Sequence, residues 1–113
     1  MIKVSFFLTR RRGSTHEEFH QYWTVKHTAL LSTPAEGMPK VHRYVQLFPT
    51  PADVPGFQMA QYDGVAEIWF ENMQDATTSF SSRHYHDVIA KDEEKFLDRS
   101  KTVCLVSHEN PVI

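Results

Sequence analysis

The order of strand-forming and helix-forming segments constrains the fold of this chain more than any other feature. Four segments are rich in β-branched and aromatic residues and are bounded by turn residues, a pattern that predicts β-strands. These strands are expected at residues 2–9, 41–48, 65–71 and 102–108. The third of them directly follows the turn dipeptide Asp63-Gly64.

Two helical segments occupy the intervals before the second and fourth strands. The first has Thr15 as N-cap, with Glu18 at capping-box spacing, and extends to about Leu31. The second begins after the N-cap Asn72, breaks near 81–82 and resumes over about 84–98. The resulting order, β-α-β-β-α-β, is the ferredoxin-like pattern. We therefore predict an α+β fold in which one helix layer covers one face of a four-stranded antiparallel sheet.

Length and charge narrow the class of protein. A chain of 113 residues suits one domain, expected to span residues 1–113. Its net charge of −2 lacks the basic excess of a nucleic-acid binder. No apolar run is long enough for a membrane span, and Arg10 to Arg12 follow the first apolar run, whereas a signal peptide has its charges before it. We expect a cytoplasmic protein with no nucleic-acid or membrane partner.

Alternation along the strands assigns side chains to the two faces of the sheet. In the third strand the apolar row of Ala66, Ile68 and Phe70 suits the helix layer. In the second strand the row of Val41, Val45 and Leu47 is assigned to the helices, although Arg43 is an exception within it. The opposite face of the sheet is then expected to carry Phe7, His42, Tyr44, Gln46, Phe48, Glu67 and Trp69.

Such an aromatic face is unusual for a sheet surface in contact with water. Large apolar faces mark interfaces or ligand surfaces. Two copies packed through this face would enclose an interior that is mostly apolar with a few polar groups, as in a small-molecule pocket. We therefore expect a homodimer that binds a small hydrophobic or aromatic ligand. The long loop over 49–64 is either a functional lid or a surface excursion.

Several motifs resemble one known family. The pattern Glu18-Phe19-x-x-Tyr22-Trp23-x-x-x-His27, followed by Asp63-Gly64-x-Ala66-Glu67-Ile68-Trp69-Phe70, is similar to the EthD family of the dimeric α+β barrel superfamily. The resemblance covers nearly the whole chain. It implies ferredoxin-like subunits that form a homodimeric α+β barrel. Relatives include lactone isomerases and polyketide cyclases or dehydratases that need no metal or organic cofactor.

Four residues are candidates for catalysis. His27 lies at the edge of an apolar helical stripe, where half burial is expected, and the resemblance implies an acid/base histidine at this helix end. His42 beside Glu67 would be held in one tautomer, and Tyr44 could donate to a developing enolate oxygen. The alternatives are a histidine stabilised at a helix C-terminus and a satisfied polar network at the dimer interface.

Substrate-binding roles are assigned to side chains expected near the same pocket. Some of these aromatic residues have plain core packing as the alternative, and His84 has a solvated turn as its alternative. The candidates are Phe7, Tyr22, Trp23, Gln46, Trp69 and His84. A metal is not expected, because His16 and His20 lie in an exposed first turn and Cys104 is a single cysteine that is expected to be buried and inert.

These residues support three hypotheses. The first is a cofactor-free proton-transfer enzyme, an isomerase, cyclase or dehydratase, acting on a small aromatic, lactone or polyketide-like carbonyl compound. The second is a non-catalytic binding or accessory protein for a hydrophobic metabolite of an ether- or aromatic-degradation pathway. The third is a haem-handling or oxygen-using protein, because sister families share the barrel.

Overall fold

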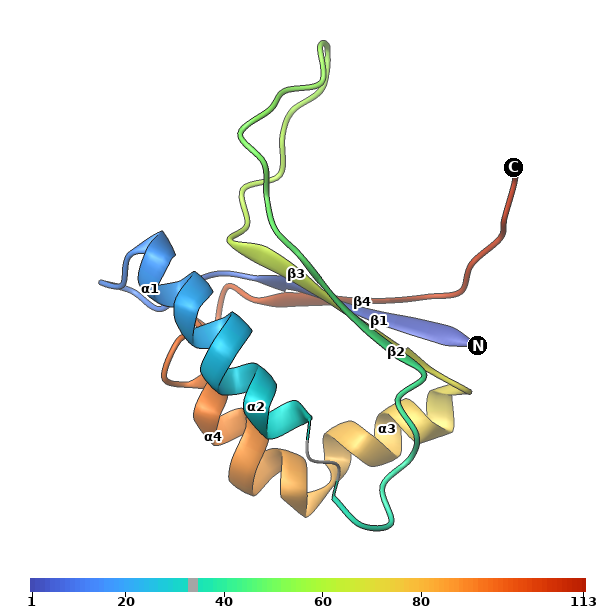
Figure 1. Ribbon diagram of the computed structural model, residues 1–113. Helices are drawn as coiled ribbons and strands as arrows, with labels where there is room; N and C mark the ends of the chain where they lie inside the picture. The colour runs from blue at the N-terminus through green and yellow to red at the C-terminus, as the bar shows by residue number, and fades with distance from the viewer. Residues whose placement is uncertain (33–34) are drawn as a thin grey trace.

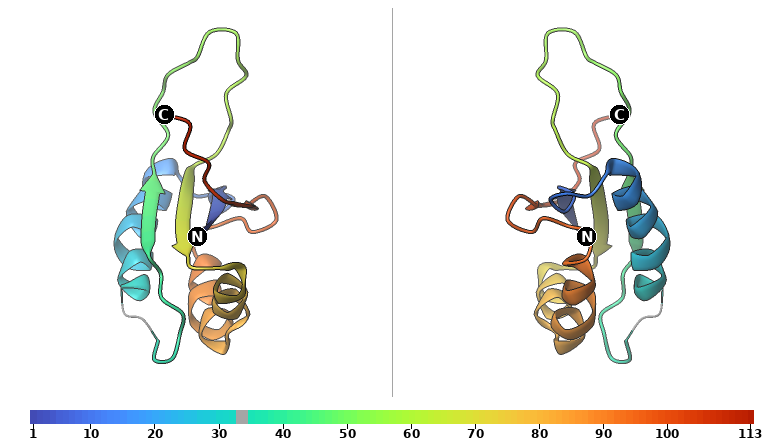
Figure 2. Two further views of the ribbon diagram at one scale, coloured as in Figure 1. Left: turned by 90° about the vertical axis from the view of Figure 1, so that its right-hand side faces the viewer. Right: turned by 90° about the vertical axis from the view of Figure 1, so that its left-hand side faces the viewer.

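The computed structural model of the chain describes residues 1–32 and 35–113. Four antiparallel strands form one sheet in the order β2-β3-β1-β4. The helices pack on one side of this sheet (Figures 1 and 2). The strands are β1 (Ile2–Leu8), β2 (Arg43–Leu47), β3 (Gly64–Phe70) and β4 (Val103–Ser107). The predicted ferredoxin-like fold is confirmed.

The first helical segment begins where its cap predicts. It comprises α1 (His16–Gln21), η1 (Tyr22–His27) and α2 (Thr28–Leu31) without a break. The Glu18 backbone N–H donates to the Thr15 hydroxyl at 3.1 Å, and the Thr15 N–H donates to the Glu18 carboxylate at 3.0 Å. This reciprocal capping box satisfies two backbone donors that the helix itself leaves unpaired.

The second helical segment is divided as expected. It comprises α3 (Met73–Ser81), η2 (Tyr85–Ile89) and α4 (Ala90–Glu93). The Asn72 side chain caps α3 by accepting from the backbone N–H of Asp75 at 2.8 Å. Both η1 and η2 are π-helical, a difference from the regular helices that were predicted. Wider π turns are common beside functional sites, and both segments here supply residues to the cavity described below.

The core lies between the helices and the inner face of the sheet. One cluster joins Phe19 and Trp23 of the first helical segment to Ala66 of β3 and to Phe96. A second cluster, centred on Phe70, packs β1 and β3 against α3. No helix in the described part of the chain is long and apolar enough to cross a membrane.

The pairing of β2 with β3 corrects the predicted faces of β2. Arg43 pairs with Trp69, and Tyr44 pairs with Ile68. Residues opposite one another on adjacent strands share a face, so Tyr44 points to the helices, where it packs against the core. The face away from the helices is called here the open face. It comprises Lys3, Ser5, Phe7, Arg43, Val45, Leu47, Val65, Glu67, Trp69, Val103, Leu105 and Ser107.

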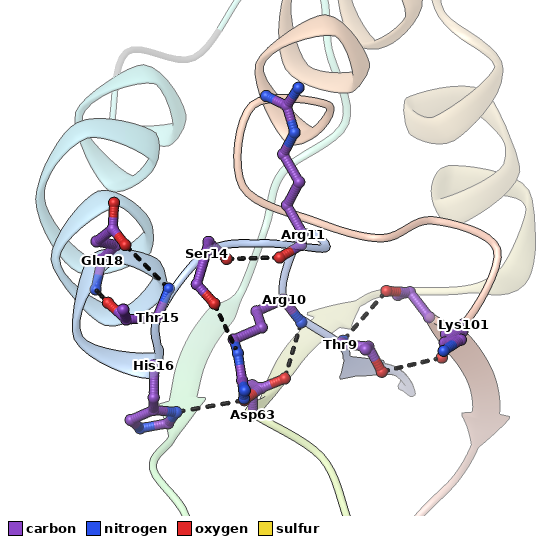
Figure 3. A network of polar contacts seen from close by, with 10 residues as sticks. Thr9, Arg10, Arg11, Ser14, Thr15, His16, Glu18, Asp63 and Lys101 are labelled. Atoms are coloured by element: carbon purple, nitrogen blue, oxygen red, sulfur yellow. Dashed lines mark hydrogen bonds and ion pairs between the residues drawn. The ribbon is translucent and has the colours of Figure 1, made fainter.

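The segment between β2 and β3 projects beyond the end of the sheet and away from the helices (Figures 1 and 2). Its return to β3 is fixed by Asp63 (Figure 3). The backbone N–H and the guanidinium of Arg10 each donate to the Asp63 carboxylate at 2.8 Å, and His16 Nδ1 lies 3.3 Å from the same group. The network joins the end of β1, the start of α1 and the base of the projecting segment.

Replacing Asp63 with asparagine is expected to destabilise the protein at pH 7 by about 1–2 kcal/mol, because charged hydrogen bonds to a partly exposed arginine are lost. Burial opposes ionisation of Asp63, but the hydrogen bonds from Arg10 outweigh it and lower the pKa. A lowered pKa stabilises the folded protein at pH values above the ordinary aspartate pKa. This contribution disappears as the pH falls through the pKa of Asp63 in the folded protein. Urea unfolding should therefore show a smaller difference in unfolding free energy between the wild type and the variant at pH 3 than at pH 7. An equal difference at the two pH values would contradict this prediction.

Candidate functional site

A cavity of about 500 Å³ lies between the helices and the sheet. Its floor includes Ala66, Ile68 and Phe70 of β3, the row correctly assigned to the helix side. The cavity is therefore formed by one chain, under the helices, and is partly open to solvent. The sequence placed the pocket on the opposite face of the sheet, between two copies; within one chain the cavity is on the helix side, because β2 presents Tyr44 inward.

His27 is the most deeply held polar group of this cavity. It is 4% exposed, more buried than predicted, and its ring lies against Phe96 with a centroid separation of 4.8 Å. His27 Nδ1 is 2.8 Å from an oxygen of Asp92 on α4. The other oxygen of Asp92 accepts a hydrogen bond of 2.6 Å from the Tyr22 hydroxyl. One buried carboxylate thus holds both the histidine and the tyrosine.

The charge of Asp92 determines which ring nitrogen of His27 carries the proton. Burial raises the pKa of Asp92, but hydrogen bonds from Tyr22 and His27 outweigh burial and lower it overall. An ionised Asp92 only accepts, so the proton of neutral His27 resides on Nδ1 and the lone pair on Nε2. Every fully buried side-chain nitrogen or oxygen of residues 1–32 and 35–113 has a partner, and among these residues the one hydrogen bond of the His27 ring joins Nδ1 to Asp92. Nε2 is therefore accessible, from the cavity that His27 lines.

Tyr44 enters the same cavity from β2. Burial raises the pKa of Tyr44, so its hydroxyl stays protonated and able to donate. Gln46 Nε2 lies 3.5 Å from this hydroxyl and donates to the Thr28 hydroxyl at 2.9 Å. Gln46 therefore links β2 to α2 without itself lining the cavity.

His42 and Glu67 do not form the predicted pair. His42 Nε2 lies 3.2 Å from the carboxylate of Glu71, at the edge of the sheet. Glu67 is on the open face, 2.9 Å from the ammonium group of Lys3 and within hydrogen-bond distance of Ser5. Neither residue lines the cavity. The register of β2 separates them, because Glu67 is opposite Val45.

Of the six predicted binding residues, two line the cavity, two lie behind its wall and two are on the open face. Trp23 and His84 line the cavity. Tyr22 and Gln46 support it from behind through Asp92 and Thr28. Two others are on the open face: Phe7 contacts Tyr62 with ring centroids 5.4 Å apart, and the indole of Trp69 lies beneath Lys3 and Arg43 and donates to Glu109.

Two acidic residues of the site were not anticipated from the sequence, Asp92 and Glu93. They fall in the charged run over 91–95, which is typical of a solvated helix. A signal was present in the spacing: Tyr85, Ile89 and Glu93 recur every four residues, which places Glu93 on an apolar stripe. The prediction that Cys104 is buried was also wrong, because Cys104 is exposed and borders the cavity. In the described ranges no three His, Cys, Asp or Glu residues are grouped to hold a metal ion.

A family model for the EthD domain matches residues 11–100, which is most of the chain and includes His27, Tyr44 and Asp92. The chain is a member of the EthD family. An ethyl tert-butyl ether D (EthD) family protein from Bacillus halodurans is 14% identical, with a TM-score of 0.69 over 97% of this chain and 99% of that chain. Comparison with curated proteins gives no match.

Two further solved structures resemble this EthD protein. A dabb family protein from Mesorhizobium loti with a ferredoxin-like fold is 14% identical, with a TM-score of 0.67 over 97% of each chain. A dimeric protein of unknown function from Bacteroides fragilis, also ferredoxin-like, is 14% identical, with a TM-score of 0.66 over 96% of this chain and 95% of that chain. At such identities the likeness shows the fold, and the reaction must be argued from the site.

Proposed function

We propose that this EthD protein is a cofactor-free enzyme that moves a proton on a small carbonyl compound, aromatic, lactone or polyketide-like. The observation that carries the proposal is the buried His27, whose Nδ1 is fixed by Asp92 while Nε2 faces an apolar cavity. A carboxylate behind a histidine fixes the orientation of the ring and its tautomer, and an imidazole can act as both base and acid in proton transfer.

The proposed chemistry assigns one role to each polar side chain. His27 Nε2 removes a proton from the carbon next to the carbonyl group, and Asp92 stabilises the imidazolium ion that forms. The Tyr44 hydroxyl donates to the enolate oxygen as charge develops there, an effect that is strong where water is excluded. Isomerisation, cyclisation and dehydration can each begin with this step.

A second candidate is a binding or accessory protein for a hydrophobic metabolite, favoured by the predominantly apolar cavity wall. The two candidates differ in what happens to the ligand. We would incubate the wild-type protein with α-angelica lactone, a small β,γ-unsaturated lactone, in D₂O and follow the C3 protons by ¹H NMR. Exchange above the rate in buffer supports the enzyme; a lactone that binds but exchanges no faster than in buffer supports the binding protein.

We also propose that two copies form a homodimer through the open face. Leu47, Val103 and Leu105 are 43–53% exposed there, an apolar set that water alone would cover in a monomer. Phe7 and Val65 extend the same surface between these residues. The dimeric relative from Bacteroides fragilis has the same fold.

Leu105→Glu is expected to convert the dimer to a monomer, because a carboxylate would be buried without a partner within the interface. Native mass spectrometry at about micromolar concentration should show a wild-type species near twice 13.1 kDa and a variant near 13.1 kDa. Val25→Glu is the matched control, since Val25 is 55% exposed but lies on η1 among the helices. A monomeric wild-type protein, or equal dissociation of both variants, would contradict the proposed interface.

A further inference from the structure

The proposed mechanism uses His27, Asp92 and Tyr44 and leaves a second polar cluster of the cavity unexplained. Glu93 of α4, Tyr85 of η2 and Arg99 all line the cavity. The Tyr85 hydroxyl donates to Glu93 Oε1 at 2.8 Å, and Arg99 Nε lies 3.8 Å from the same oxygen. The Glu93 side chain is 16% exposed, so it is a largely buried carboxyl group within an apolar wall.

Two consecutive acidic residues serve opposite sides of the same site. Asp92 binds His27 from behind, through Nδ1, while Glu93 enters the cavity. His27, Tyr44 and Glu93 all line this one cavity. A ligand there would contact a base, a hydroxyl donor and a second carboxyl group together.

We propose that Glu93 is the catalytic acid of this site, so that the proton is returned to a different carbon from the one His27 deprotonates. This inference rests on the proposed proton-transfer function. It assigns the substrate class as unsaturated carbonyl compounds, including lactones, whose double bond moves during the reaction.

The step balances without any co-reactant. His27 Nε2 bonds the proton of the carbon between the carbonyl group and the double bond, and the electrons of that C–H bond form a dienolate. The O–H bond of Glu93 then breaks as its proton bonds the far carbon of the dienolate, which places the double bond next to the carbonyl group. Substrate and product have one formula. The imidazolium ion of His27 and the carboxylate of Glu93 are reset by proton exchange with water.

The surroundings of Glu93 favour its acid form. Burial raises the pKa of Glu93, and neighbouring Asp92 raises it further. Hydrogen bonding by Tyr85 and the charges of Arg99 and His27 oppose this rise but do not cancel it. Burial also raises the pKa of Tyr85, which stays a protonated donor that orients the Glu93 carboxyl group.

The test follows C3 and C5 of α-angelica lactone independently in D₂O. Loss of the C3 proton signal reports the base, and formation of the conjugated isomer with deuterium at C5 reports the acid. Glu93→Gln keeps an acceptor for Tyr85 but has no proton to transfer. The ratio of isomer formed to C3 exchange in the same tube is expected to fall about 10²-fold or more. Glu94→Gln, which alters the exposed neighbour, should leave that ratio unchanged.

Failure of this inference is distinguishable from failure of the proposed function. If Glu93→Gln leaves the ratio of isomer to exchange unchanged while the wild-type protein still exchanges C3, Glu93 is not the acid but the proton-transfer function stands. If the wild-type protein exchanges no C3 proton, the proposed function fails with this probe. Because the role of Glu93 rests on that function, it fails in the same case.

Discussion

His27→Ala is expected to lower the C3 exchange of α-angelica lactone to the rate in buffer, a loss of about 10²–10⁴-fold. The reason is geometric: among the cavity residues, His27 offers an accessible imidazole nitrogen whose opposite nitrogen is fixed by Asp92 at 2.8 Å. The measurement is the initial rate by ¹H NMR, with far-UV circular dichroism to show that the variant is folded. Exchange that persists at the wild-type rate would exclude His27 as the base.

Asp92→Asn tests whether the charge of Asp92 assists His27 as the base. The amide has the shape of the carboxylate but no charge, so it neither stabilises the imidazolium ion nor enforces the Nδ1–H tautomer. Exchange should fall less than in His27→Ala yet well below that of Asp87→Asn, which alters an exposed carboxylate of η2. Equal rates for the two aspartate variants would mean that Asp92 has only a structural role.

Local signals explain why most of the fold could be predicted. Thr15 with Glu18 and the N-cap Asn72 each act within one helical turn, so their effect is contained in a few neighbouring residues. The strand segments likewise contain their own alternation and turn residues. Such signals do not depend on which distant residues pack together, and the order of elements follows from them.

The face of β2 could not be assigned in the same way, because each row mixes characters: Arg43 shares one row with Val45 and Leu47, and the other row has Tyr44 and Gln46. The row with Val45 and Leu47 has the aliphatic character of a core, yet it lies on the open face. Arg43 was the useful signal, since a charged residue in that row is accommodated over Trp69, at 4.9 Å from its ring, and not under the helices. The aromatic row of Tyr44 packs inward and moves the site to the helix side of the sheet.

The acidic half of the site depends on tertiary structure. Asp92 meets His27 across 65 positions of sequence, and nothing local distinguishes it from its charged neighbours in the 91–95 run. His27 itself could be proposed from the helical stripe and the family resemblance. Its partner depends on tertiary packing, because Asp92 reaches His27 only where α4 packs against η1.

Trp23→Ala is expected to destabilise the protein by about 3–5 kcal/mol, the range for removing a fully buried large aromatic side chain. Trp23 is 1% exposed and packs against Phe19 and Phe48, with ring centroids 5.5 and 5.8 Å away. Urea unfolding monitored by circular dichroism would measure the change. Because total stabilities of domains are about 5–15 kcal/mol, Trp23→Phe is the variant to use if the alanine variant does not fold.

The same ring explains why position 64 is glycine. A Cβ atom at Gly64 would lie 2.5 Å from Cζ3 of Trp23, a contact that the buried indole cannot avoid without moving. Gly64→Ala is therefore expected to cost about 1–3 kcal/mol, and less in a Trp23→Phe background, where the clashing ring atoms are absent. Additive costs in this double-mutant cycle would contradict the contact. Since Trp23 also lines the cavity, the Gly64→Ala variant should displace the indole and slow C3 exchange even where the protein remains folded.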